Sequence, residues 1–160
     1  MAERKLRRLQ YKNYISMLNA LPQVELFRHL YVVDESGNEF DAVDDGDLSC
    51  AVVVSSILCL FGWIDRPHAT VASTIKALVE NGWRATETPK SGDIVHYSAS
   101  EAGHEHVGFF MGNDIVISNI AKLRTPGKHE LMMSDGRLPI GYYTRNYEED
   151  LNGQEEENES

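Results

Sequence analysis

The chain has 160 residues, of which 42% are hydrophobic and 25% charged, and its formal net charge is −10. This length predicts a single domain, residues 1–147, with a sizeable core. Residues 148–160 hold seven carboxylates and no basic residue, so we expect an acidic disordered tail there. The rest of the chain has no basic surplus, which argues against nucleic acid as a main partner.

The N-terminal residues 1–20 are charged and lack the apolar core of a secretory signal. No apolar stretch is long enough to cross a bilayer, so we expect no integral membrane segment. These features predict a cytoplasmic protein, unless it is exported by a route that needs no signal peptide. The sequence makes no prediction about the oligomeric state.

Three helices are predicted in the first half of the chain. Residues 3–21 carry leucines and Tyr14 at roughly helical spacing among basic side chains. We favour an amphipathic helix packed on the domain over a membrane-surface or nucleic-acid contact. An almost wholly apolar helix should run from Cys50 to Phe61, buried nearly all round. A further helix, Thr70 to Glu80, should end at the Asn-Gly pair that follows it.

Strands are predicted in the second half of the chain. The β-rich runs are 93–98, 106–111, 115–120 and 139–144, and residues 112–114 form a turn signal that predicts a hairpin. Residues 124–136 read as irregular. Helices followed by antiparallel strands predict an α+β domain in which the central apolar helix packs on the sheet.

Two cysteines lie in the central helix, and only the first has an environment suited to chemistry. Asp47 and Ser49 are N-cap residue types, so the helix should begin close to Cys50, where free backbone N–H groups and the helix dipole favour a thiolate. Cys59 lies more than two turns further in and should be a small apolar residue. The two thiols point to opposite faces of the helix and should not form a disulfide. The acidic loop 41–47 leads into this helix and could form one lip of a cleft.

A nucleophilic thiol needs a base, and His106 is the best candidate. It opens the strand His-Val-Gly-Phe-Phe-Met at 106–111. An imidazole on a strand that faces a helix-start thiol is the arrangement that a thiolate–imidazolium pair requires. A third side chain then orients the ring through its other nitrogen.

Taken together, these motifs resemble those of the papain-like cell-wall cysteine hydrolases, the NlpC-type peptidases and CHAP-type amidases. The matching features are a helix-start Cys50, a Gly-Asp-Ile-Val strand at 92–95 and the His106 strand with its following hairpin. The resemblance implies a papain-like fold and a thiol-dependent hydrolase acting on an amide or peptide bond. Cys50 would be the nucleophile and His106 the base. A peptide or peptidoglycan-like substrate is implied, with no cofactor and no metal.

The third catalytic residue could be Ser118 or Asn119. NlpC-type strands put their third residue at 118, and CHAP-type strands favour 119. If the hairpin loop has two residues, strand alternation places Asn119 beside His106 and turns Ser118 away. We therefore predict Asn119, whereas a three-residue loop or a bulge would select Ser118.

Several alternatives compete with this interpretation. A non-catalytic binding or regulatory domain could use the same fold. Cys50, His104 and His106 could form a zinc site, although no standard ligand spacing supports it. His129 could line the cleft, but we expect a surface loop histidine. Trp63 and Trp83 are expected in the core.

Overall fold

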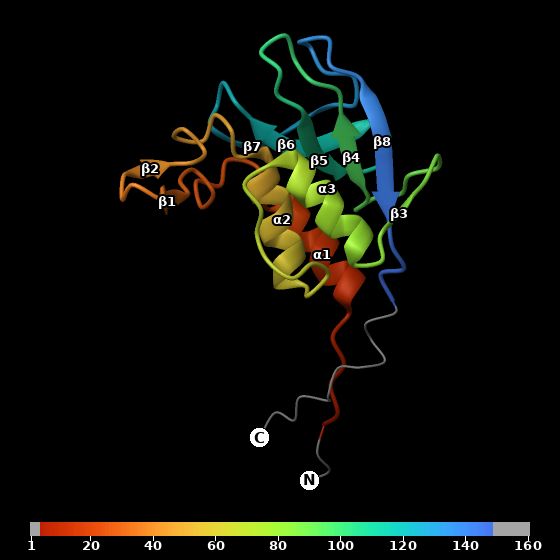
Figure 1. The fold of residues 1–160 in the computed structure, drawn as a ribbon. Coiled ribbons are helices and arrows are strands. Elements are labelled where there is room, and N and C mark those ends of the chain that lie inside the picture. The colour runs from red at the N-terminus through yellow and green to blue at the C-terminus, as the bar shows by residue number, and fades with distance from the viewer. Residues whose placement is uncertain (1–3, 149–160) are drawn as a thin grey trace.

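The computed structural model describes residues 4–148, which form three helices and eight strands (Figure 1). The helices are α1 (Gln10–Asn19), α2 (Cys50–Leu60) and α3 (Val71–Glu80). The strands are β1 (Tyr31–Val33), β2 (Glu39–Asp41), β3 (Arg84–Ala85), β4 (Ile94–Tyr97), β5 (His106–Phe110), β6 (Ile115–Ile120), β7 (Thr125–Glu130) and β8 (Pro139–Thr144). The predicted tail from residue 149 onward lies outside the described residues.

Six strands form one antiparallel sheet in the order β3-β8-β4-β5-β6-β7. The three helices gather beside this sheet, and the separate β1–β2 hairpin projects away from the body (Figure 1). The predicted α+β class with an antiparallel sheet is confirmed. Within residues 4–148, every helix is too short or too polar to cross a membrane.

The apolar helix α2 lies at the centre of the larger core cluster. Val53, Val54 and Leu58 of α2 are fully buried, and the helix packs on β5 and β6. Odd-numbered residues of those strands, including Phe109 and Ile117, belong to the same cluster. Because side chains alternate along a strand, the even-numbered residues face the other way, and there Phe110 joins a second, smaller cluster. Loop residues Leu131 and Met133 pack against that second cluster.

An aromatic group ties α1 to the rest of the core. The Tyr14 ring of α1 contacts Trp63 edge-on at 4.7 Å between centroids and stacks on Tyr147 at 5.6 Å. The Arg145 guanidinium lies 4.9 Å from the Trp63 ring and 5.7 Å from the Trp83 ring, in cation–π geometry. Both tryptophans are buried, so their predicted core role is confirmed.

The aspartate of the Gly-Asp-Ile-Val motif has a structural role. Asp93 is fully buried, and its carboxylate accepts hydrogen bonds from the Thr144 hydroxyl at 2.7 Å and the Tyr147 hydroxyl at 2.8 Å. It also accepts from the Lys90 backbone N–H, and the Lys90 ammonium lies 3.6 Å away. These bonds compensate a buried charge and fasten the start of β4 to the end of β8.

Strand β7 was missed because its sequence, Thr-Pro-Gly-Lys-His-Glu, contains two residues that weaken strand predictions. The structure places β7 at the edge of the sheet, where Pro126 needs no outward N–H bond. Helix α1 is shorter than predicted and begins at Gln10, although Tyr14 and Leu18 are buried as expected.

The hairpin between β5 and β6 has a three-residue loop. Met111 N–H bonds to the carbonyl of Ile115 at 2.8 Å, and Gly112, Asn113 and Asp114 all have positive φ. Phe109 therefore pairs with Ile117 and Phe110 with Val116. The two-residue loop assumed from the sequence is wrong, so even-numbered residues of β6 share a face with His106.

Gly108 should be required for this close pairing. A Cβ at Gly108 would lie 2.7 Å from Cβ of Ser118 and 3.1 Å from the Ile117 carbonyl oxygen. We expect Gly108→Ala to lower the free energy of unfolding by about 1–3 kcal/mol, measured by urea denaturation. Gly141→Ala in β8 is the matched control, because its Cβ would meet nothing closer than 3.8 Å. Equal losses in the two variants would contradict the prediction.

Candidate functional site

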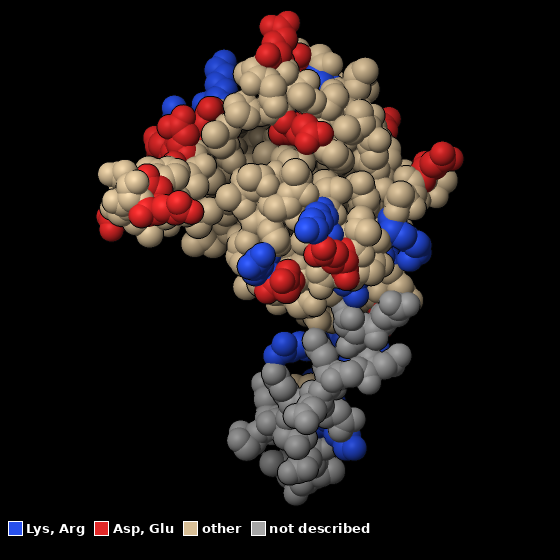
Figure 2. Space-filling model, viewed as in Figure 1, with Lys and Arg blue, Asp and Glu red and all other residues tan. Residues whose placement is uncertain are grey.

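A cleft of about 1090 Å³ opens where the N-terminal end of α2 meets the sheet. Its walls come from the loop before α2, the start of β5, the ends of β6 and β7, and the loop 131–138. Figure 2 shows a hollow at this place, with an acidic side chain beside it. Ala42, Asp47 and Leu48 line the cleft, so the expected lip before α2 is confirmed.

Cys50 occupies the first position of α2 and lines this cleft. Ser49 is the residue before the helix, but its hydroxyl donates to the Phe27 carbonyl at 2.5 Å and makes no cap hydrogen bond. The backbone N–H groups of Val107 and Ala51 are placed to hydrogen-bond the sulfur, which favours its thiolate form. The thiol therefore lies between the helix terminus and the beginning of β5.

Asn119 holds the loop that leads to Cys50. Its amide N–H donates to the Gly46 carbonyl at 2.8 Å, and the residue is only 4% exposed. Gly46 has φ +87°, and a Cβ there would lie 2.7 Å from the Arg124 carbonyl oxygen. Arg124 in turn donates to the carbonyl oxygens of Asp44 and Asp45. These contacts fix the path of the chain into α2 from the side of β6.

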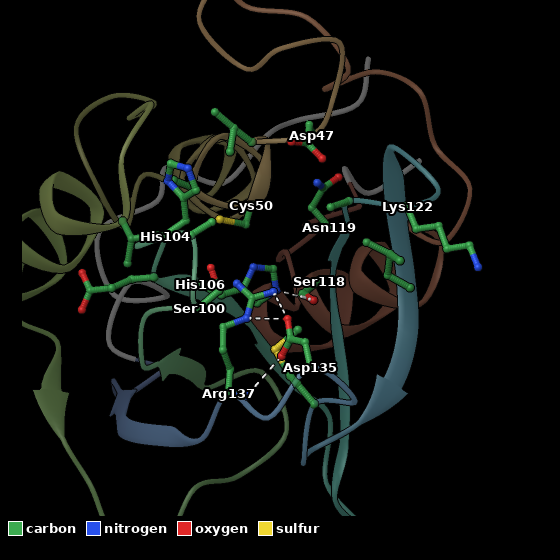
Figure 3. Close-up of a pocket in the computed structure, with 18 of the residues that line it drawn as sticks. Asp47, Cys50, Ser100, His104, His106, Ser118, Asn119, Lys122, Asp135 and Arg137 are labelled. Atoms are coloured by element: carbon green, nitrogen blue, oxygen red, sulfur yellow. Dashed lines mark hydrogen bonds and ion pairs between the residues drawn. The ribbon is translucent and has the colours of Figure 1, made fainter.

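His106 belongs to a chain of three polar side chains that crosses β5, β6 and β7. His106 Nε2 lies 2.8 Å from the Ser118 hydroxyl, and the same hydroxyl lies 2.7 Å from His129 Nε2. The other nitrogen of His129, Nδ1, lies 2.7 Å from the Glu130 carbonyl oxygen. Figure 3 shows His106 and Ser118 joined, with Cys50 and Asn119 at the opposite side of the cleft.

The contact between His129 and the Glu130 carbonyl determines which atoms donate and which accept in these hydrogen bonds. A carbonyl oxygen only accepts, so His129 Nδ1 must carry the proton and, in the neutral ring, Nε2 is the acceptor. The Ser118 hydroxyl then donates to His129 Nε2 and accepts from His106 Nε2–H. This leaves Nδ1 of a neutral His106 unprotonated, and a bare nitrogen is what a general base needs.

Burial controls the charge state of the site. It raises the pKa of the Cys50 thiol above its usual value, more than the neighbouring N–H groups and Arg137 lower it. Burial also lowers the pKa of His106 to about 3 and lowers the pKa of His129. Near neutral pH both the thiol and the imidazole are therefore uncharged. The depressed thiol pKa expected from the helix terminus is wrong for this structure.

Arg137 brings a cation to the same cleft from the loop 131–138. Its Nη2 lies 2.7 Å from an Asp135 carboxylate oxygen, and its Nε donates to that carboxylate at 2.8 Å. Its positive charge lowers the pKa of the Cys50 thiol, against the effect of burial. It also lowers the pKa of His106, in the same direction as burial. Figure 3 shows the guanidinium drawn between Asp135 and the His106–Ser118 pair.

The predicted site residues thus line one cleft, but their contacts differ from those predicted. Cys50 and His106 line the same cleft, and Ser118 rather than Asn119 hydrogen-bonds the imidazole. His129 is not a surface loop residue, because it lies on β7 and contacts Ser118. Residues 127 and 129 share one face of β7. If the sequence had indicated a strand here, strand alternation would therefore have predicted which way His129 faces.

The proposed zinc alternative gains no support. His104 is exposed while His106 is buried, and no three metal-ligating side chains within residues 4–148 are placed to hold a metal ion. Both cysteines are free, as expected.

No protein-family model matches the chain, and no curated protein sequence matches it significantly.

The thiol of Cys50 should be slow to alkylate at neutral pH. Since burial raises the pKa of the Cys50 thiol, its thiolate fraction should keep increasing at pH values where a free cysteine is already ionised. We expect iodoacetamide to label Cys50 at pH 7 at least about tenfold more slowly than N-acetylcysteine, with the rate still rising above pH 9. Peptide mass spectrometry distinguishes Cys50 from Cys59. Labelling at pH 7 that outpaces the free thiol would contradict this prediction.

Proposed function

We propose that this protein is a thiol-dependent hydrolase that cleaves an amide or peptide bond. The observation that carries the proposal is the thiol at the N-terminus of α2, which lines the same cleft as His106, whose orientation is held by Ser118 and His129. A nucleophile, a base and a group that orients the base are the three parts that such chemistry requires.

The reaction would begin from a neutral pair. As the Cys50 sulfur attacks the carbonyl carbon, the thiol proton passes to His106 Nδ1, and the carbonyl π-electrons move to the oxygen. The imidazolium then returns the proton to the leaving nitrogen as the C–N bond breaks, which yields a thioester. Water attacks the thioester with His106 again as base, and the sulfur leaves with a proton.

The helix terminus would stabilise the charged intermediate. The Cys50 backbone N–H is in the first turn of α2, where no intrahelical acceptor is available to it. Such a group can donate to an oxyanion, and its position at the positive end of the helix dipole strengthens the interaction.

The α+β arrangement supports a papain-like fold and, through the motif resemblance, peptidoglycan peptides as the first substrate class to test. The apolar helix bearing Cys50 packs on the antiparallel sheet bearing His106, which is the arrangement expected of such hydrolases. A cleft of about 1090 Å³ has room for a peptide segment.

The competing candidate is a non-catalytic binding domain. The raised pKa of the Cys50 thiol and the lowered pKa of His106 favour it, because a preformed ion pair is absent at neutral pH. In that case the histidine–serine chain would serve to satisfy buried polar groups.

Hydrolysis should therefore be tested directly. Purified peptidoglycan and a mixture of generic peptides are incubated with the protein, and the products are read by mass spectrometry. Mass additions of one water at defined bonds are expected for the wild type, and none for Cys50→Ala. If the wild type and Cys50→Ala give identical spectra on both substrate sets, the binding-domain candidate replaces the hydrolase.

The two adjacent residues of β6 should have separable roles. Ser118→Ala removes the partner of both imidazoles, so we expect turnover to fall at least about tenfold. Asn119→Ala removes the bond to Gly46 and should mainly lower the free energy of unfolding, by about 1–2 kcal/mol. Turnover and urea denaturation are measured on both variants. A larger turnover loss in a fully folded Asn119→Ala would restore Asn119 as the orienting residue.

A further inference from the structure

Arg137 is a cation placed at the reacting groups, and neither the sequence motifs nor the proposed mechanism gives it a task. It lines the cleft together with Cys50, His106 and His129, and its side chain is only 14% exposed although it belongs to a loop. A guanidinium removed from water in this way interacts more strongly with an anion than one on the surface does.

The present partner of Arg137 is local and exchangeable. Asp135, two residues earlier, is 43% exposed at its side chain and receives both described bonds on one carboxylate oxygen. The backbone N–H of Arg137 also bonds to Asp135, so the pair is held by its own short segment. Because the Asp135 carboxylate is open to water, it loses little when it leaves the pair, and an incoming carboxylate can replace it or share the guanidinium.

The other charged residues that line the cleft favour binding of an anion near Arg137. Asp47, Glu105 and Glu130 also line the cleft and would repel a carboxylate that approached them. The other lining cation, Lys122, projects on the opposite side of the labelled group from Arg137 (Figure 3). A substrate anion would thus be attracted to the end of the cleft near His106.

We propose that Arg137 binds a carboxylate of the substrate beside the reacting carbonyl, so that the protein selects acidic peptides or peptides with a free carboxylate at that position. The planar fork of the guanidinium matches a carboxylate in two parallel hydrogen bonds. The Asp135 carboxylate occupies the same donors when no substrate is bound. This inference deepens the proposed hydrolase function and rests on it for the identity of the ligand as a substrate.

A pair of alkylating agents tests the anion site without any hydrolysis. Iodoacetate and iodoacetamide place the same reactive carbon on a carboxylate or a neutral amide, and in both the Cys50 sulfur forms an S–C bond and releases iodide. The rates at Cys50 are measured at pH 9 by peptide mass spectrometry, and their ratio is compared with that of N-acetylcysteine. We expect the iodoacetate-to-iodoacetamide ratio at Cys50 to exceed that of the free thiol by about tenfold.

Three variants separate the charge of Arg137 from a structural effect. Arg137→Gln should lower the ratio about tenfold, to that of the free thiol, while Arg137→Lys should keep part of the preference. Asp135→Asn should raise the ratio, because it removes the competing carboxylate. The iodoacetamide rate and the melting temperature report any general disturbance of the site.

The outcomes distinguish this inference from the proposed function. An unchanged ratio in Arg137→Gln, or a wild-type ratio equal to that of the free thiol, overturns the carboxylate site even if the protein hydrolyses peptides. A preference for iodoacetate that depends on Arg137 supports the site even if no tested substrate is cleaved.

Discussion

A single hydroxyl proton sets the chemistry of the cleft. Ser118 lies between two imidazoles and can donate to only one of them, and the Glu130 carbonyl decides that this one is His129. This fixes the tautomer of His106 two strands away, because its unprotonated nitrogen must then face away from Ser118. The arrangement depends on β6 lying close to β5, which Gly108 permits by having no side chain.

Strand β6 contributes to both sides of the site, because successive side chains point to opposite faces of the sheet. Ser118 faces the imidazoles, whereas its neighbour Asn119 faces the helix side and holds Gly46 ahead of Cys50. A shift of one residue in the pairing of β5 and β6 would exchange these roles. The register of one hairpin, fixed by three residues with positive φ at 112–114, therefore decides which side chain of β6 contacts His106 and which holds the loop before Cys50.

Local patterns in the sequence were sufficient for α2, β5, β6 and β8, and for placing Cys50 and His106 in one cleft, because long apolar and alternating runs depend little on context. They failed where tertiary context decides. Pro126 and Gly127 argue against a strand, yet an edge position tolerates both, and so His129 was missed. Arg137 lies in a segment with no periodicity, and only the folded loop brings it to the cleft.

Arg137 is better suited to binding than to activating the thiol. A cation that faces both reacting groups favours the thiolate but disfavours the imidazolium, and it lowers both pKa values here. When the proton moves from Cys50 to His106, the net charge of the pair stays zero, so a nearby cation changes the free energy of the transfer only through the orientation of the resulting dipole. An anionic substrate, in contrast, meets the full field of the guanidinium. The low dielectric surroundings that keep the pair neutral would strengthen this attraction, so burial opposes ionisation of the resting thiol and would favour the carboxylate site proposed at Arg137.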